Sequence, residues 1–148
     1  MTNRKQSVKV LGETSEELPV IYGVPQGSCL GPLLFLIYIN DLANAHTSGE
    51  FVLFADDTNI FVNAKTKSLA YKIANEILTK VSRYMQANKL HINMGKCCYM
   101  YFSPEDTPND HTPQDTLTIN SIPIKQVTQT KFLGVTIDHN LSWIPHIK

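Results

Sequence analysis

The stretch that decides the fold is FVLFADDTNIFV, residues 51–62, in which two β-prone runs flank the pair Asp56-Asp57. Valine, isoleucine and phenylalanine favour strands, whereas Asp is common in the short loops where a chain reverses. The sequence therefore predicts a tight hairpin with both carboxylates at its tip. The first run is almost wholly apolar, which predicts a strand buried on both faces and a fixed position for the acids.

Two adjacent carboxylates repel each other unless a cation or solvent intervenes. Mg²⁺ is usually held by one or two carboxylates together with substrate phosphates, an arrangement that serves phosphoryl transfer. Asp56 and Asp57 are therefore candidate metal ligands, and the small Ala55 leaves room for a bulky substrate end beside them. The alternative is a solvated turn in which Asp is simply a good turn former.

A second candidate site is the turn GVPQGS, residues 23–28. Gly23 and Gly27 permit close approach of a ligand to the backbone, Pro25 restricts the turn, and Gln26 offers an amide that can form two hydrogen bonds. An ordinary connection between a strand and a helix remains the alternative for this segment.

Hydrophobic spacing and turn residues predict the other elements. The first is a hairpin over 7–22, followed by an apolar helix from about 28 or 31 to 45 that is expected to be buried on most sides. A second helix is predicted over 68–88, with Ser68 as its cap. Strands are predicted over 97–102 and 131–138, and a small hairpin over 117–124. This order predicts an α+β fold, an antiparallel sheet with helices on one face. Six residues are expected in its core: Leu36, Ile39, Leu53, Leu69, Ile73 and Ile77.

Composition limits the class of protein. The chain has 148 residues, of which 43% are apolar, enough for one domain with its own core. Its three cysteines are too few and too irregular for a disulfide framework, and no ligand spacing indicates zinc. The longest apolar run, residues 33–39, is far shorter than the roughly 20 residues that a membrane span needs. An intracellular protein without a membrane segment is expected.

Charge is balanced overall, with 13 basic and 13 acidic residues, but it is unevenly distributed. Residues 103–115 combine three prolines with four acids and are predicted to be a mobile loop. The opposite sign dominates residues 65–96, where Glu76 is the one acid among seven cations: Lys65, Lys67, Lys72, Lys80, Arg83, Lys89 and Lys96. This basic face could contact nucleic-acid phosphates, or it could be a solvated helix face without a partner.

Several of these stretches together resemble reverse transcriptases of non-LTR (LINE-like, jockey-type) retrotransposons. The residues that carry the resemblance are GVPQGS at 23–28, the apolar run that follows it, FADD at 54–57 and KFLGVTID at 131–138. The resemblance covers about residues 4–148 and implies an incomplete right-hand polymerase palm. It also implies two-metal nucleotidyl transfer with Mg²⁺ or Mn²⁺, and an RNA template, a DNA primer and deoxynucleoside triphosphates as partners, in the nucleus for the intact protein.

The resemblance implies a role for individual residues. Asp56 would ligate the catalytic metals directly, with Asp57 in a less direct role, and Lys96 would protonate the leaving pyrophosphate. The nucleotide and template would be contacted by Pro25, Gln26, Gly27, Ser28 and Ala55, and the primer by Phe132, Leu133 and Gly134. Lys96 is followed by Cys97 where the family more often has Thr.

The resemblance also implies parts that the sequence lacks. A further metal-binding Asp, on a strand before Gly23, is expected, but the acids ahead of Gly23 are Glu13, Glu16 and Glu17. Residues 1–148 are therefore expected to be a palm fragment with motifs B to E but without motif A, fingers and thumb. Such a fragment should be inactive alone. The alternative is a non-catalytic nucleic-acid-binding or scaffold remnant of the same fold.

Overall fold

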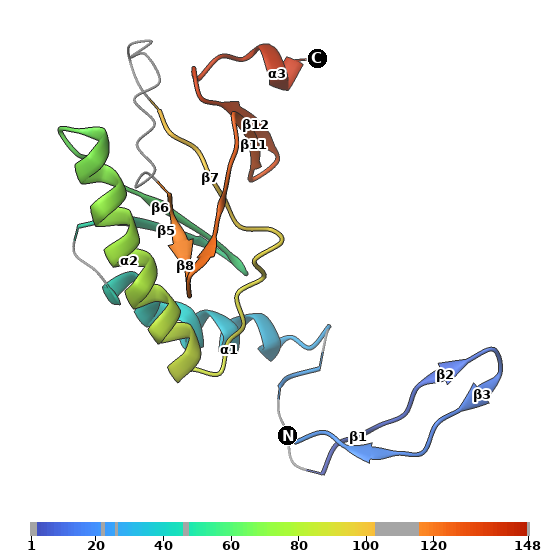
Figure 1. Cartoon of the computed structure of the whole chain (residues 1–148). Helices are drawn as coiled ribbons and strands as arrows, with labels where there is room; N and C mark the ends of the chain where they lie inside the picture. The colour runs from blue at the N-terminus through green and yellow to red at the C-terminus, as the bar shows by residue number, and fades with distance from the viewer. Residues whose placement is uncertain (1–2, 22, 26, 46–47, 103–115, 148) are drawn as a thin grey trace. The chain divides into compact units, whose positions relative to one another are not determined.

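The computed structural model describes residues 3–21, 23–25, 27–45, 48–102 and 116–147 (Figure 1). The chain divides into two compact units, Met1–Asn40 and Asp41–Lys148, which are described separately below. The predicted mobile loop at 103–115 and the predicted site residue Gln26 lie outside the described residues. None of the described helices is both long enough and apolar enough to cross a membrane.

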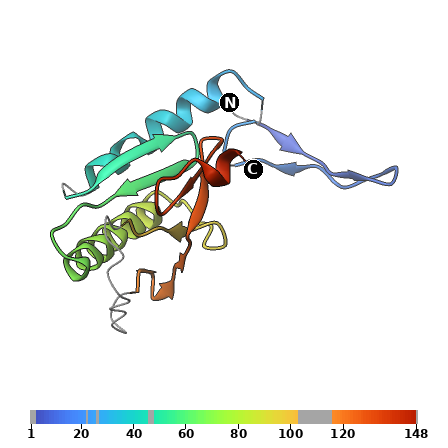
Figure 2. The ribbon, with the colours of Figure 1, turned by 90° about the horizontal axis from the view of Figure 1, so that it is seen from above.

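The first unit begins with a two-stranded ribbon, drawn out clearly in Figure 2. Strand β1 (Lys5–Gln6) pairs antiparallel with β4 (Leu18–Pro19), and β2 (Lys9–Val10) pairs with β3 (Glu13–Thr14). The predicted hairpin over 7–22 is confirmed. Its connection is shorter than expected, because Leu11 and Gly12 make a two-residue turn with φ of 51° and 93°.

Helix α1 (Leu30–Ile39) follows in the same unit, and the 3₁₀ helix η1 (Asn40–Ala45) continues the chain. The predicted helix is thus confirmed, although its last turns are 3₁₀. The expectation that it is buried on most sides is wrong: Gly31 and Ile39 are buried in α1, whereas Leu36 is 51% exposed. A helix that is apolar all round needs neighbours on every side, and a thin two-stranded ribbon is too small to supply them.

The second unit is built on the hairpin that opened the analysis. Strand β5 (Glu50–Phe54) pairs antiparallel with β6 (Asp57–Phe61), from Glu50 opposite Phe61 to Phe54 opposite Asp57. Both views show α2 (Lys67–Ala87) alongside this hairpin (Figures 1 and 2). A Cβ placed on Gly49 would lie 2.7 Å from Cδ1 of Ile77, so the start of β5 packs closely on α2.

Helix α2 is amphipathic, as its spacing predicted. Its cap is Thr66 and not Ser68: the Thr66 backbone is extended, and its hydroxyl accepts the N–H of Leu69 at 3.3 Å. Ile77 is fully buried as expected, and Ile73 is half-buried. Leu69 was wrongly expected in the core, because it lies seven residues before Glu76 and therefore on the polar side of the helix.

Short strands complete the second unit. Strand β7 (Cys98–Tyr99) pairs in parallel with β10 (Lys125–Gln126), and β8 (Thr118–Ile119) pairs antiparallel with β9 (Ile122–Pro123). Strand β8 packs on α2, where Tyr71 forms a buried cluster with Leu117, Ile119 and Ile124. The predicted hairpin over 117–124 is confirmed, whereas the predicted strand over 97–102 is limited to two residues.

The predicted strand over 131–138 is wrong, because this segment reverses in its middle. Strand β11 (Gln129–Phe132) pairs antiparallel with β12 (Val135–Asp138), and helix α3 (Ile144–Ile147) follows. The two-residue turn consists of Leu133 and Gly134, whose φ values of 46° and 90° are typical of hairpin turns. Glycine adopts this conformation without steric cost, which makes the reversal possible.

The mixture of helices and antiparallel strands agrees with the predicted α+β class. The prediction of a single antiparallel sheet is wrong, because the described strands form separate two-stranded ladders, one of which is parallel. Strands of two residues, such as β8 and β9, satisfy few backbone groups and cannot extend a sheet sideways.

Candidate functional site

The tip of the β5–β6 hairpin places the acidic pair differently from the prediction. Phe54 and Asp57 form the last pair of the ladder, so the two turn residues are Ala55 and Asp56. Asp56 is at the tip as expected, whereas Asp57 is the first residue of β6. The strand pairing therefore fixes the backbone of Asp57, and the turn holds Asp56.

The backbone at this tip is strained. Ala55 has φ of +49°, in the left-handed region that costs a residue with a Cβ about 1–2 kcal/mol. Two-residue hairpin loops require positive φ, so the tight turn imposes this conformation on Ala55. The pairing of five residues on each strand supports the strained tip.

The tip is open to solvent. Ala55, Asp56 and Asp57 are all exposed, and neither carboxylate bonds to any other residue that the structure describes. The preceding strand is less buried than predicted, since Leu53 is half-buried and Phe54 is 59% exposed. The two acids are therefore available to ligands from outside this hairpin.

The described residues do not complete a metal centre around the tip. Within them, no three His, Cys, Asp or Glu side chains lie close enough together to hold an ion. Asp56 and Asp57 offer hard carboxylate oxygens as ligands. A site with only two such side chains suits a cation such as Mg²⁺, which keeps several waters or binds substrate phosphates. The pair fits part of a metal site, and its remaining ligands would be water and substrate.

The second candidate, the turn at residues 23–28, belongs to the first unit and is described by itself. Gly23 and Gly27 have φ of +82° and +79°, so this turn needs glycine for its backbone conformation. The Ser28 hydroxyl accepts the N–H of Gly31 at 3.1 Å, which links the turn to the first turn of α1. A guanidinium N–H of Arg4 donates to the carbonyl of Gly23, which ties the turn to β1.

Lys96 lies in a turn between α2 and β7 and is exposed. The Asn93 carbonyl accepts the Lys96 N–H at 3.0 Å, and its side chain accepts the Gly95 N–H at 3.1 Å, so the turn is well ordered. Burial, and then the neighbouring Cys98, raise the pKa of the Cys97 thiol, which keeps it protonated at neutral pH.

The predicted primer-contact residues lie at a second hairpin tip. Phe132 pairs with Val135, and Leu133 with Gly134 forms the exposed turn between β11 and β12. Sequence reasoning treated these residues as part of one strand and so missed their position at a tip. Gly134, which lies between two β-prone runs, is the sequence signal that could have indicated a reversal here.

Sequence reasoning also missed a well-made carboxylate contact at the end of β12. Asp138 accepts the Ser142 hydroxyl at 2.7 Å and the Ser142 N–H at 2.6 Å. The bond from the Ser142 hydroxyl is the main reason why the pKa of Asp138 is lowered. An Asp followed four residues later by Ser is a local pattern that can indicate such a side-chain-to-backbone bond.

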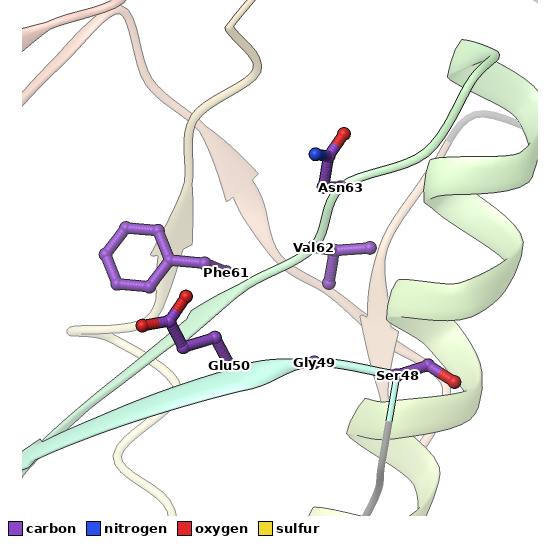
Figure 3. Close-up of a pocket in the computed structure, with 6 residues that line it drawn as sticks. All are labelled: Ser48, Gly49, Glu50, Phe61, Val62 and Asn63. Atoms are coloured by element: carbon purple, nitrogen blue, oxygen red, sulfur yellow. The ribbon is translucent and has the colours of Figure 1, made fainter.

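A shallow depression of about 530 Å³ lies at the open end of the same β5–β6 hairpin, away from the acidic tip (Figure 3). Its lining residues are Ser48, Gly49, Glu50, Phe61, Val62 and Asn63. Glu50 is the single titratable group in this lining, and it forms no ion pair with any residue that the structure describes. The depression therefore lacks the paired acid and base, or paired ligands, that chemistry at this end would need.

These features point to one class of protein. The reverse transcriptase (RNA-dependent DNA polymerase) family matches residues 2–137, and the chain belongs to this family.

The relatives identify the type of reverse transcriptase. The RNA-directed DNA polymerase from mobile element jockey of Drosophila melanogaster is 30% identical over an alignment of 155 residues that covers 99% of this chain. The probable RNA-directed DNA polymerase from transposon X-element of the same species is 29% identical over 151 residues, also 99% of this chain. The jockey polymerase of Drosophila funebris is 30% identical over 153 residues, 97% of this chain.

The chain is thus homologous to the polymerases of non-LTR retrotransposons, which confirms the family expected from the sequence. It spans 16% of the length of each of these three relatives. No solved structure matches it significantly.

Proposed function

We propose that the chain is the catalytic palm segment, motifs B to E, of an RNA-directed DNA polymerase, in which Asp56 is a direct ligand of the catalytic metal. The observation that carries this proposal is the acidic tip: two exposed carboxylates that have no partner among the described residues, held at a strained turn by a regular hairpin. Membership of the reverse transcriptase family over residues 2–137 supports the reading of this tip as catalytic and not merely as a solvated turn.

The chemistry of the tip favours Mg²⁺ or Mn²⁺. Carboxylate oxygens are the ligands that these hard cations prefer, and Asp56 and Asp57 are the pair that would hold them. When bound, such an ion neutralises the charge that develops as a primer hydroxyl attacks a nucleoside triphosphate and pyrophosphate leaves.

The chain's own residues bind and orient the other reactants in this proposal. The turn with Pro25, Gln26, Gly27 and Ser28 contacts the incoming nucleotide and the template together with Ala55, and the exposed Lys96 donates a proton to pyrophosphate. The exposed tip formed by Phe132, Leu133 and Gly134 contacts the DNA primer. An RNA template and deoxynucleoside triphosphates complete the substrates, and the nucleus is the place of action of the intact polymerase.

A second candidate function is a non-catalytic nucleic-acid-binding or scaffold module. The observation that favours it is the exposed side of α2, where Lys72, Lys80 and Arg83 make no ion pair with any described residue. These cations could bind phosphates without any chemistry at the tip. The two candidates differ in whether Asp56 is needed.

The test replaces the matching segment of the Drosophila melanogaster jockey polymerase with residues 1–148 and measures primer extension on an RNA template. Asp56→Asn should lower the rate by about a thousandfold, since a metal ligand contributes several kcal/mol of charge stabilisation. Glu50→Gln, on the same hairpin, is the matched control and should retain activity. Equal activity of the two variants would contradict the catalytic reading.

The isolated chain gives an independent readout. Mn²⁺ should broaden NMR signals around residues 55–57 only at about millimolar concentration, because two carboxylates make a weak site. Asp56→Asn should remove this broadening, and the isolated chain should not extend primers. Tight binding that survives Asp56→Asn would contradict the assigned ligand.

A further inference from the structure

A polar depression of about 360 Å³ lies between α2 and the turn that joins β8 to β9. Its lining residues are Thr79, Arg83, Gln86, Thr118, Asn120 and Ser121, none of them apolar and none acidic. It lies on other elements than the acidic tip, and the proposed polymerase chemistry does not use it. A concave surface with one cation and neutral hydrogen-bonding groups suits an anion with several oxygen atoms.

The walls of this depression are tied together by hydrogen bonds from the buried side of α2. The Ser82 hydroxyl, almost fully buried, donates to the side-chain carbonyl of Asn120 at 2.6 Å. Two turns earlier, the Asn75 side chain accepts the N–H of Thr118 at 3.0 Å and donates to the Thr116 carbonyl at 3.1 Å. The helix and the β8–β9 turn are therefore held in register before any ligand binds, which reduces the entropy cost of binding.

The same bonds determine which lining groups can donate to a ligand. The side-chain carbonyl of Asn120 is used by Ser82, so the amide nitrogen of Asn120 is its remaining group, and it is a donor. The side chains of Arg83, Gln86 and Ser121 make no hydrogen bond or ion pair with another described residue. Thr79 is the exception, because its hydroxyl already donates to the Asn75 carbonyl at 2.8 Å. The Arg83 guanidinium and the Asn120 amide nitrogen can thus only donate, whereas the Gln86 amide and the hydroxyls of Thr118 and Ser121 can donate or accept.

The electrostatics of the helix surface agree with an anion. Lys80 lies one turn before Arg83, where side chains three residues apart are neighbours, and Lys72 lies on the same side. Glu76 is the one acid on this exposed side of α2.

The end of α2 would disfavour an anion if its carbonyls were free. Three of its last four carbonyls are occupied: the N–H groups of Asn88, Lys89 and Leu90 donate to the carbonyls of Tyr84, Gln86 and Met85 at 3.0, 3.0 and 2.8 Å.

We propose that this depression binds a backbone phosphate of a single nucleic-acid strand through the Arg83 guanidinium, with Lys80 contacting the neighbouring phosphate. A strand is favoured over a lone phosphate ion because the cations continue along the helix beyond the depression. This inference rests on the second candidate function and deepens it, because it names the residues that would bind the phosphates. It requires neither Asp56 nor a metal.

The test uses the 148-residue chain and fluorescence anisotropy with labelled 12-nucleotide single-stranded RNA and DNA of the same sequence. Arg83→Gln should raise Kd about tenfold and lower the slope of log K against log salt by about one. Arg83→Lys should restore part of the affinity, since it keeps the charge but loses the forked donors. The matched control, Lys125→Gln on the exposed β10, should change Kd less than about twofold.

The outcomes are separable from those of the polymerase test. Arg83→Gln should leave the Mn²⁺ broadening around residues 55–57 unchanged, so failure of this site and failure of the metal site are distinguishable. Equal increases in Kd for Arg83→Gln and Lys125→Gln would overturn the site. Binding of the RNA oligonucleotide but not of the DNA oligonucleotide would also overturn it, because that result would indicate recognition of the 2′-hydroxyl. If inorganic phosphate displaced the labelled oligonucleotide when both were present at the same concentration, the assignment to a strand would be overturned.

Discussion

At its open end the β5–β6 hairpin packs on α2, whereas at its tip the same hairpin stands in solvent. The open end has Gly49 directly against Ile77, a fully buried side chain. The tip has a strained Ala55 and two carboxylates without partners among the described residues. One end therefore anchors the hairpin by packing, and the other remains free to bind ligands. The comparison shows how a short element can combine stability with an accessible, pre-positioned site.

The largest stability effect is expected at the anchored end. Gly49→Ala would place a Cβ 2.7 Å from Cδ1 of Ile77. Overpacking of this kind costs about 1–3 kcal/mol, which urea denaturation would measure. The double variant Gly49→Ala with Ile77→Val should recover part of the loss, because it removes the atom that clashes. Full stability of Gly49→Ala would show that this end is not the anchor.

A smaller effect of opposite sign is expected at the tip. Ala55→Gly removes the penalty of a left-handed Ala, and after the extra entropy of glycine in the unfolded chain it should stabilise the protein by about 0.5–1 kcal/mol. Ala45→Gly, in η1 with no positive φ, is the matched control and should destabilise. If both variants destabilise equally, the tip is not strained.

The smallest effect concerns a carboxylate that, unlike those at the tip, has partners. Bonds from Ser142 lower the pKa of Asp138, so its contribution to stability is present above the ordinary Asp pKa of about 3.9 and is lost as pH falls through the lowered value. Asp138→Asn should therefore lower Tm at pH 7, and the difference should disappear in acid. Ser142→Ala should remove most of this pH dependence. A Tm difference that does not shrink as the pH falls below the ordinary Asp pKa would contradict the assignment.

Local sequence patterns determined much of this molecule. The β-prone runs around Asp56, the spacing of apolar residues in α2 and the turn at Asn120-Ser121 each depend on residues close together in the chain, where backbone preference and periodicity act. Family membership likewise followed from short motifs, because chemistry at a tip requires particular residue types in a particular order.

Tertiary structure decided the rest, for reasons that periodicity cannot contain. Exposure of Leu36 and Leu69 depends on which neighbours surround each helix, and the ladders depend on pairing between distant strands. The bond between Ser82 and Asn120 joins residues 38 apart, and the bonds from Asn75 reach 41 and 43 residues along the chain. Such contacts arise only once α2 and β8 pack together. For that reason the polar depression at Arg83 could not be read from the sequence, whereas the acidic tip could.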